Sequence, residues 1–222
     1  MSRTYNTLLF DLDGTLIDSA PGVLGCLKKM LKAMDIPEPG NMYKFMGPPL
    51  QRSLKMFCGL DGEEAAKALK LYRELYETEG IMNTLAYDGI SEMLRRLSSE
   101  GKTLAVATCK SQDFAVRILE DLGIADYFDF IGGSDAASDR DSKDKVIEYV
   151  MENLGQPDRS STLMIGDRLY DAEGSGKCGI SCLYVLWGYG STEEATACGA
   201  LDTVRTTEDC IGYVLGTEQA AG

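Results

Sequence analysis

Side chains that could do chemistry follow three short apolar segments of the chain, at the point where each segment ends. Asp11 and Asp13 follow the segment 8–10, Thr108 follows 104–107, and Asp167 comes shortly after 163–165. Residues two apart on an extended chain share a face, so Asp11 and Asp13 can point into one site. Two close carboxylates repel each other unless a proton or a cation offsets the charge. Because Mg²⁺ prefers carboxylate oxygens, the pattern predicts a Mg²⁺ site with Asp167 as a further ligand.

The amino-acid composition narrows the chemistry further. The 222 residues include no histidine, which excludes Ser-His-Asp triads, Cys-His pairs and imidazole acid–base catalysis. The chain has 35 Asp and Glu against 22 Lys and Arg, a net charge of −13. An acidic chain has no basic surplus with which to bind nucleic acid or an anionic membrane surface. Catalysis is therefore expected from carboxylates, lysine, hydroxyls and backbone amides, with a metal.

The cysteines and the apolar segments bear on the location of the protein. Its seven cysteines are odd in number and include no CxxC pair, so we expect reduced thiols and not disulfides or a zinc site. No apolar run approaches the roughly 18 residues that a membrane-spanning helix needs, and no charged-then-apolar leader opens the chain. The expectation is a cytoplasmic protein that does not associate with membranes.

Short apolar segments alternate with helical patterns along most of the chain. The expected strands are 8–10, 104–107, 127–131, 163–165 and 182–186. Apolar residues at helical spacing predict helices over 90–97, 114–122 and 146–154, each followed by a glycine that can end it. Continuous apolar strands that alternate with helices are typical of a parallel sheet covered on both faces. The predicted fold class is therefore α/β.

One long segment interrupts this alternation. Between residues 10 and 104 no strand is expected, whereas 23–34 and 65–76 have helical apolar faces separated by a proline-rich loop. We interpret residues 17–83 as a helical insertion after the first strand. The core would then consist of residues 1–16 and 84–222.

The polar motifs at the strand ends match a known family. Residues 11–16 read Asp-Leu-Asp-Gly-Thr-Leu, Thr108 ends the second strand, a lysine opens a later helix, and residues 166–171 read Gly-Asp-Arg-Leu-Tyr-Asp. In this order they resemble the signatures of the haloacid dehalogenase superfamily of phosphohydrolases, and the resemblance covers essentially the whole chain. It implies a three-layer α/β/α Rossmann-like core with a small α-helical cap inserted after the first strand. Residues 45–50, Phe-Met-Gly-Pro-Pro-Leu, resemble a cap segment of phosphoglycolate-phosphatase-like sequences.

The resemblance also implies a role for each motif residue. Asp11 would be the nucleophile that forms an aspartyl-phosphate, and Asp13 the general acid and base. Mg²⁺ would be held by Asp11 and Asp167 through carboxylate oxygens and by Asp13 through its backbone carbonyl. The expected substrate contacts are Thr108, Cys109, Lys143 and, from the cap, Arg52.

Three assignments stay open at this level. The family lysine is expected at Lys143 and not Lys145, because it lies one turn before the apolar face of its helix, while Lys110 is expected at the entrance to the site. Asp171 is expected beside the metal, hydrogen-bonded near it, although a metal ligand or a helix cap would also fit. Arg168 either pairs with a carboxylate or contacts the substrate.

The predicted function is a Mg²⁺-dependent phosphatase that hydrolyses a small phosphorylated metabolite, with phosphoglycolate as the first candidate. The alternatives are a 5′-nucleotidase or another small-metabolite phosphatase, then a phosphoryl mutase. From a different class, a receiver-type phosphoacceptor domain also uses a strand-end Asp, but it lacks an acid at the position of Asp13 and a helical insertion. The oligomeric state is left open.

Overall fold

The computed structural model describes residues 4–135 and 138–216 of the chain. Within these residues the main sheet has six strands, all parallel, in the order β5-β4-β1-β6-β7-β8. The strands are β1 (Thr7–Phe10), β4 (Thr103–Ser111), β5 (Phe130–Ser134), β6 (Thr162–Gly166), β7 (Ser181–Val185) and β8 (Asp202–Val204). Because the chain order reverses around β1, the carboxyl ends of β4, β1 and β6 lie side by side. In open α/β sheets this switch point is where ligands bind.

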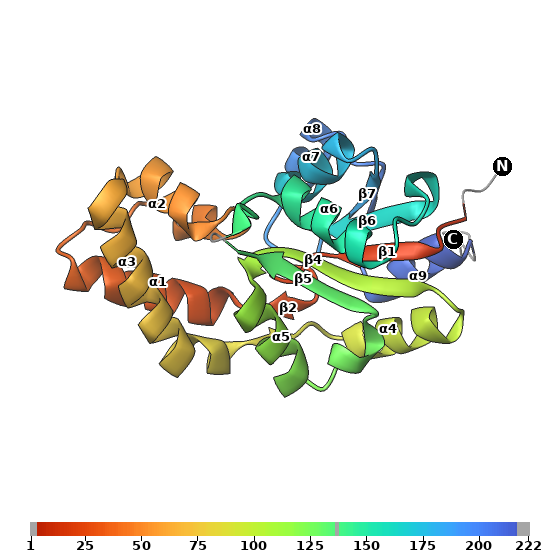
Figure 1. Ribbon diagram of the computed structural model, residues 1–222, viewed down its shortest axis with the longest axis horizontal. Helices are drawn as coiled ribbons and strands as arrows, with labels where there is room; N and C mark the ends of the chain where they lie inside the picture. The colour runs from red at the N-terminus through yellow and green to blue at the C-terminus, as the bar shows by residue number, and fades with distance from the viewer. Residues whose placement is uncertain (1–3, 136–137, 217–222) are drawn as a thin grey trace.

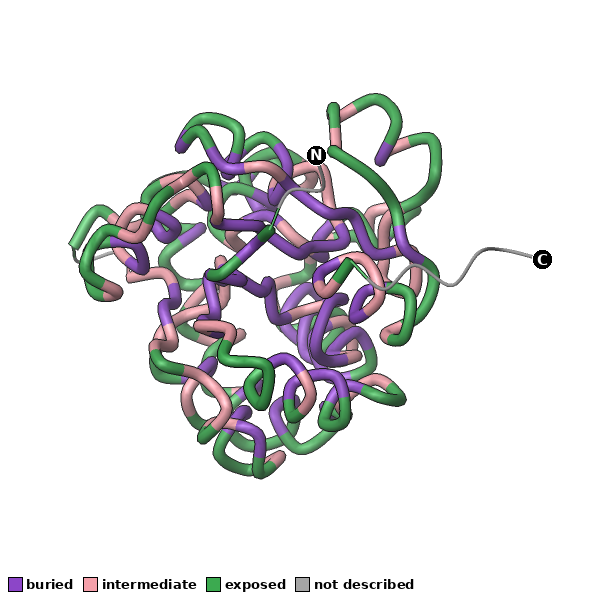
Figure 2. The backbone as a smooth tube through the Cα atoms, turned by 90° about the vertical axis from the view of Figure 1, so that its right-hand side faces the viewer, coloured by how far each residue is buried: buried purple, intermediate pink, exposed green. Residues whose placement is uncertain are grey.

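Helices cover both faces of the sheet (Figure 1). One face carries α6 (Lys143–Asn153) and α7 (Leu169–Lys177), with α8 (Thr192–Ala197) beside them, and the other carries α4 (Ile90–Ser99), α5 (Gln112–Asp121) and α9 (Thr207–Leu215). Strand residues alternate between the two layers: Leu8 and Phe10 belong to one buried cluster and Leu9 to the other. Figure 2 shows buried segments through the middle of the molecule, with exposed segments around them. The predicted three-layer α/β/α core is confirmed.

The inserted helices lie together beyond one end of the sheet (Figure 1). They are α1 (Ala20–Ala33), α2 (Leu50–Cys58) and α3 (Gly62–Leu75). Apolar side chains of α1, such as Leu27 and Met30, belong to one buried cluster with Ala65 and Ala68 of α3. The helices therefore share a small core of their own, continuous with that of the sheet. The boundaries of the insertion at residues 17 and 83 remain a prediction.

The expectation that no strand lies between residues 10 and 104 is wrong. Strand β2 (Ile17–Asp18) pairs antiparallel with β3 (Leu85–Ala86), at the two ends of the inserted segment. Two residues are too few to produce a recognisable alternation of apolar and polar side chains. This ribbon joins the two connections between the core and the inserted helices.

The fifth strand also differs from its prediction. Residues 127–131 were expected to be extended, but Ala125–Tyr127 is a turn of 3-10 helix and β5 runs over Phe130–Ser134. The strand includes Gly132 and Gly133, which are not apolar signals. A Cβ at Gly133 would lie 2.7 Å from Cα of Gln112, so only glycine fits this close approach of β5 and α5.

Among the described residues, no helix has the length and apolarity that spanning a bilayer requires.

Candidate active site

Lys143 lies at the floor of the site, between two carboxylates. It begins α6, which packs against β4, and its side chain is only 4% exposed. Its Nζ is 2.7 Å from Oδ1 of Asp11 and 2.7 Å from Oδ1 of Asp171. The ammonium also donates a hydrogen bond to the carbonyl of Ala107 at 2.8 Å. Burial lowers the pKa of Lys143, whereas the two carboxylates raise it. The net change is an increase, so the lysine stays charged.

Lys145 takes no part in this cluster. Its ammonium contacts Asp139 at 2.9 Å and Asp141 at 2.8 Å on the exposed surface. Two positions along a helix turn a side chain by about 200°, so Lys143 and Lys145 point in nearly opposite directions. The structure therefore brings Lys143, and not Lys145, to Asp11.

Three buried carboxylates meet where β1 and β6 end. Oxygen atoms of Asp11, Asp167 and Asp171 all lie within 4.8 Å of one another. Asp167 is held in place by the Thr15 hydroxyl, which donates to Oδ1 at 3.2 Å, and by the Tyr189 amide, which donates to Oδ2 at 2.7 Å. Burial, followed by the charges of Asp171 and Asp11, raises the pKa of Asp167 well above its usual value. Burial likewise raises the pKa of Asp11 to about 6, although Lys143 opposes the change.

These residues fit a divalent cation with a preference for oxygen ligands. Three clustered acids face one buried ammonium, so the cluster carries an uncompensated negative charge that a Mg²⁺ ion would neutralise. The chain also closes tightly around Asp167: a Cβ at Gly14 would lie 2.2 Å from its Oδ2, and one at Gly188 would lie 2.4 Å from its Cβ. The donor set is thus both acidic and held in position.

The tight turn after β1 leads to the first testable prediction. Gly14 has φ +89°, and its amide donates to the carbonyl of Ile17 at 2.8 Å. We expect Gly14→Ala to lower the free energy of unfolding by about 2 kcal/mol or more, because Ala is strained at positive φ and its Cβ overlaps Asp167. Gly176→Ala is the control: Gly176 lies in α7 with no atom within 4 Å of its Cβ position, so this variant should be no less stable than the parent. Equal chemical denaturation midpoints for the two variants would contradict the prediction.

Lys110 is buried beside Asp13, and its expected position at the entrance is wrong. Its Nζ lies 2.9 Å from Oδ1 of Asp13, and its side chain is 7% exposed. The Ser19 hydroxyl donates to the same oxygen, and the ring centroid of Tyr76 lies 4.9 Å from the ammonium. Strand β4 continues to Ser111, with an irregular register against β5 between Ala107 and Ser111, so Lys110 still belongs to the strand end that carries Thr108.

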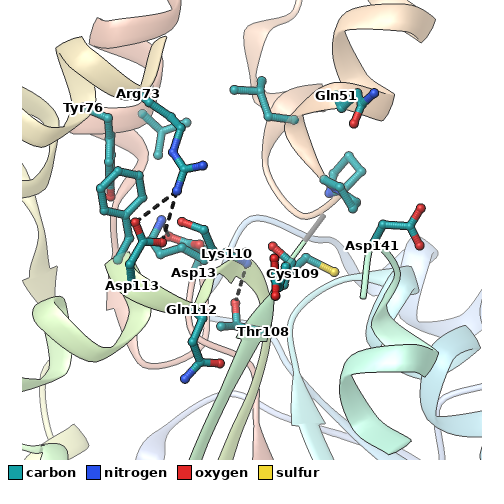
Figure 3. Close-up of a pocket in the computed structure, with 18 of the residues that line it drawn as sticks. Asp13, Gln51, Arg73, Tyr76, Thr108, Cys109, Lys110, Gln112, Asp113 and Asp141 are labelled. Carbon is teal, nitrogen blue, oxygen red and sulfur yellow. Dashed lines mark hydrogen bonds and ion pairs between the residues drawn. The ribbon is translucent and has the colours of Figure 1, made fainter. Parts of the chain in front are cut away.

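Thr108 and Cys109 lie at the same edge, on the last part of β4. Thr108 is 1% exposed, and its hydroxyl accepts a hydrogen bond from the amide of Lys110 at 3.2 Å. Cys109 is half-buried. Both residues line the cavity close to Asp13 (Figure 3), and Asp11 lines the same cavity.

Asp171 and Arg168 take positions that the sequence left open. Asp171 caps α7, because its Oδ2 accepts a hydrogen bond from the Arg168 amide at 3.0 Å, while its Oδ1 faces Lys143. The Arg168 guanidinium pairs with Glu194 at 2.9 Å and donates to the carbonyl of Met46 in the inserted segment. Arg168 therefore pairs with a carboxylate and joins the core to the insertion.

A cavity of about 720 Å³ opens above the carboxylates, between the core and the inserted helices (Figure 3). Arg52, the expected substrate contact from the cap, is exposed on α2 and is not among the residues that line it. Its neighbour Gln51 lines the cavity instead, because successive residues of a helix point about 100° apart. Arg73 and Arg140, which sequence reasoning missed, also line the cavity. Neither lies in a motif, so only the fold brings them there.

A doubly covered parallel sheet with an acidic, lysine-bearing site at its carboxyl edge places the chain among the Rossmann-like α/β proteins that bind a ligand at the strand ends. The chain belongs to the haloacid dehalogenase-like hydrolases, whose family model matches residues 8–185.

Curated relatives and a solved structure agree with this assignment. A 5′-nucleotidase of Pseudomonas aeruginosa is 35% identical over 87% of this chain and 88% of its own length. A tyrosine-protein kinase, PtkA of Mycobacterium tuberculosis, is 37% identical over 89% of this chain and 70% of its own. A phosphoglycolate phosphatase of Aquifex aeolicus is 32% identical over 82% and 85%. The crystal structure of a predicted phosphatase from Clostridium acetobutylicum superposes with a TM-score of 0.91 at 38% identity, over 96% of this chain and 99% of that one. The predicted family and enzyme class, a phosphoric monoester hydrolase, are confirmed.

Proposed function

We propose that this protein is a Mg²⁺-dependent phosphatase that hydrolyses a small phosphomonoester through an aspartyl-phosphate on Asp11. The observation that carries the proposal is the position of Lys143, 2.7 Å from Asp11, which belongs to a cluster of buried carboxylates and also lines the cavity. This arrangement supplies a nucleophile, a fixed positive charge and oxygen ligands for a metal within a few ångströms.

In the first step a carboxylate oxygen of Asp11 attacks phosphorus, and the bond from phosphorus to the ester oxygen breaks. The departing alcohol takes a proton from the carboxyl group of Asp13. In the second step Asp13 removes a proton from a water molecule that attacks the aspartyl-phosphate, which releases phosphate and restores Asp11. Lys110 and Ser19 both bind Oδ1 of Asp13, so they orient its carboxyl group for these transfers.

Positive charge and hydrogen-bond donors near Asp11 stabilise the phosphoryl group in transit. The Thr108 hydroxyl lies near the end of β4, and the Lys143 ammonium lies beside that strand. Both are close to where the phosphoryl oxygens would lie. Asp11 and Asp167 would hold Mg²⁺ through their carboxylates and Asp13 through its backbone carbonyl, with Asp171 adjacent. When bound, Mg²⁺ offsets the negative charge shared by the phosphoryl group and the carboxylates.

The metal requirement gives a direct test. We expect removal of divalent cations with EDTA to reduce hydrolysis by about 10³-fold or more, since the uncompensated carboxylates would repel a phosphate dianion. Excess Mg²⁺ should restore the rate. Both effects can be measured on a panel of phosphomonoesters, with the rate of phosphate release as the readout. Full activity in EDTA would contradict the proposal.

The sequence resemblance and the relatives suggest two substrates. Phosphoglycolate follows from the resemblance of the inserted segment and the Aquifex aeolicus relative, and a 5′-nucleotide follows from the Pseudomonas aeruginosa relative. A phosphoryl mutase would use the same first step, and it is distinguished by return of the phosphoryl group to a sugar and not to water. A receiver-type domain is disfavoured by Asp13 and by the cavity that the inserted helices close over Asp11.

We also propose a cytoplasmic location. All seven cysteines are free thiols in the structure, four of them buried. Free thiols persist where the surroundings are reducing, and this supports the location expected from the sequence.

A further inference from the structure

We propose that the cavity selects phosphomonoesters whose leaving group is uncharged and carries a ring, such as a nucleoside or a phenol, and discriminates against a leaving group that bears a carboxylate. This inference rests on the proposed function and names the substrate class of the same site. It is carried by the charges and the shape of the residues that line the cavity.

Every basic side chain among the described residues that line the cavity already has an acidic partner. The pairs are Arg73 with Asp113 at 3.0 Å, Lys110 with Asp13 at 2.9 Å, Arg117 with Asp121 at 3.8 Å and Arg140 with Asp135 at 3.9 Å. Lys143, at the floor, lies between two carboxylates. A substrate carboxylate would therefore have to displace an existing partner before it could pair with a cation of the cavity.

Acidic groups also outnumber basic ones around the cavity. The six described acids that line it are Asp11, Asp13, Asp113, Glu120, Asp135 and Asp141, and the four bases are Lys110, Arg73, Arg117 and Arg140. A bound Mg²⁺ would offset the charge at the floor, where the phosphoryl group lies, and not at the walls. A second anionic group on the substrate, such as the carboxylate of phosphoglycolate, thus finds no surplus of positive charge among the described residues that line the cavity, whereas an uncharged leaving group needs none.

The wall contributed by the inserted helices and α5 is largely aromatic and aliphatic. Tyr72 and Tyr76 stack with ring centroids 5.6 Å apart, and Phe114 meets Tyr76 edge-on at 5.0 Å. Val23 and Leu69 line the same cavity. Such surfaces favour an apolar or ring-bearing group over a small, strongly hydrated anion. With a volume of about 720 Å³, the cavity has room for a leaving group far larger than a two-carbon acid.

The polar groups of the wall suit an uncharged partner. Asp113 and Asp141 lie on opposite sides of the cavity (Figure 3), and together with Glu120 they supply carboxylate oxygens whose lone pairs can accept further hydrogen bonds even where an ion pair is present. Hydroxyl or amino donors of a nucleoside could bind them without a charge of their own. A phenol would use the aromatic wall alone. The shared chemistry is an uncharged ring-bearing alcohol, and the two sources are separated by experiment.

The test compares four substrates on the full chain with saturating Mg²⁺: a nucleoside 5′-monophosphate, phenyl phosphate, glycerol 3-phosphate and phosphoglycolate. We expect kcat/KM for phosphoglycolate to be about tenfold or more below that of the better ring-bearing substrate, with glycerol 3-phosphate between them. Preference for the nucleotide over phenyl phosphate would identify a nucleoside as the leaving group, and the reverse a phenol. Phosphoglycolate at or above the ring-bearing substrates would overturn the inference. Absence of hydrolysis and of a phosphoenzyme with all four would overturn the proposed function as well.

A matched pair of variants tests the role of the paired cations. Asp113→Asn leaves Arg73 without its partner, so kcat/KM for phosphoglycolate relative to the ring-bearing substrate should rise by about fivefold or more. Glu92→Gln breaks an exposed pair with Arg95 on α4, away from the cavity, and should leave this ratio unchanged. Arg73→Gln removes the cation itself and should not raise the ratio. An unchanged ratio in a folded Asp113→Asn protein, or an equal rise in Arg73→Gln, would overturn the assignment.

Discussion

Asp11→Asn is expected to reduce phosphatase turnover by about 10⁵-fold, the scale on which removal of a covalent nucleophile acts. The Asn amide cannot form the mixed anhydride that an aspartyl-phosphate represents. Acid quenching during turnover should trap a phosphoryl group on the parent protein and none on the variant. The measurement is kcat from phosphate release, together with the intact mass of the quenched protein. A phosphoenzyme on the variant, or comparable turnover, would move the nucleophile elsewhere.

The same variant should remain folded, which separates loss of chemistry from loss of structure. The pKa of Asp11 is raised from its ordinary 3.8 to about 6, because burial disfavours the charged form. Folding therefore favours the protonated acid, so this group destabilises the metal-free protein as the pH rises from 4 through 6. Asp11→Asn removes that cost. In EDTA at pH 8 the melting temperature of Asp11→Asn should be no lower than that of the parent. The control is Asp126→Asn, which removes an exposed carboxylate and should leave the melting temperature unchanged.

The carboxylates and the threonine of the proposed active site could be predicted from the sequence because each follows a recognisable strand. Asp11, Thr108 and Asp167 each lie at the end of a continuous apolar run, and parallel strands bring such ends to one edge. The family resemblance led us to expect a lysine at the start of this helix, and helical spacing favoured Lys143 because it lies one turn before Ile147 on the buried face. In each case a local pattern carries the position of a residue in the fold.

The residues that form the walls of the cavity could not be predicted from local sequence patterns. Arg73 meets Asp113 across forty positions of sequence, and the two lie on α3 and α5, which no local pattern relates. Lys110 was misplaced because the apolar run ends at Ala107, whereas the strand continues to Ser111 through the buried Thr108 and three half-buried residues. Strand extension driven by a functional cluster has no hydrophobic signature.

Lys143→Ala is expected to destabilise the metal-free protein by about 3–5 kcal/mol, the cost of leaving buried carboxylates without their cation. Its Nζ is the ammonium within 2.7 Å of both Asp11 and Asp171. Turnover should fall by about 10³-fold as well, because the fixed charge beside the phosphoryl group is lost. Lys145→Ala removes only exposed contacts, and its stability should stay within about 0.5 kcal/mol of the parent.

Metal binding separates the two consequences of losing Lys143. A divalent cation that binds the folded carboxylate cluster stabilises it by mass action, so excess Mg²⁺ should raise the melting temperature of Lys143→Ala more than that of the parent. Turnover should not return, since the proposed Mg²⁺ ligands are Asp11 and Asp167, and the fixed charge that Nζ supplies beside the phosphoryl group would still be missing. Recovery of both stability and turnover would reduce Lys143 to a structural counter-charge. A Lys145→Ala protein that loses more activity than Lys143→Ala would transfer the catalytic role to Lys145, against the geometry that separates the two side chains.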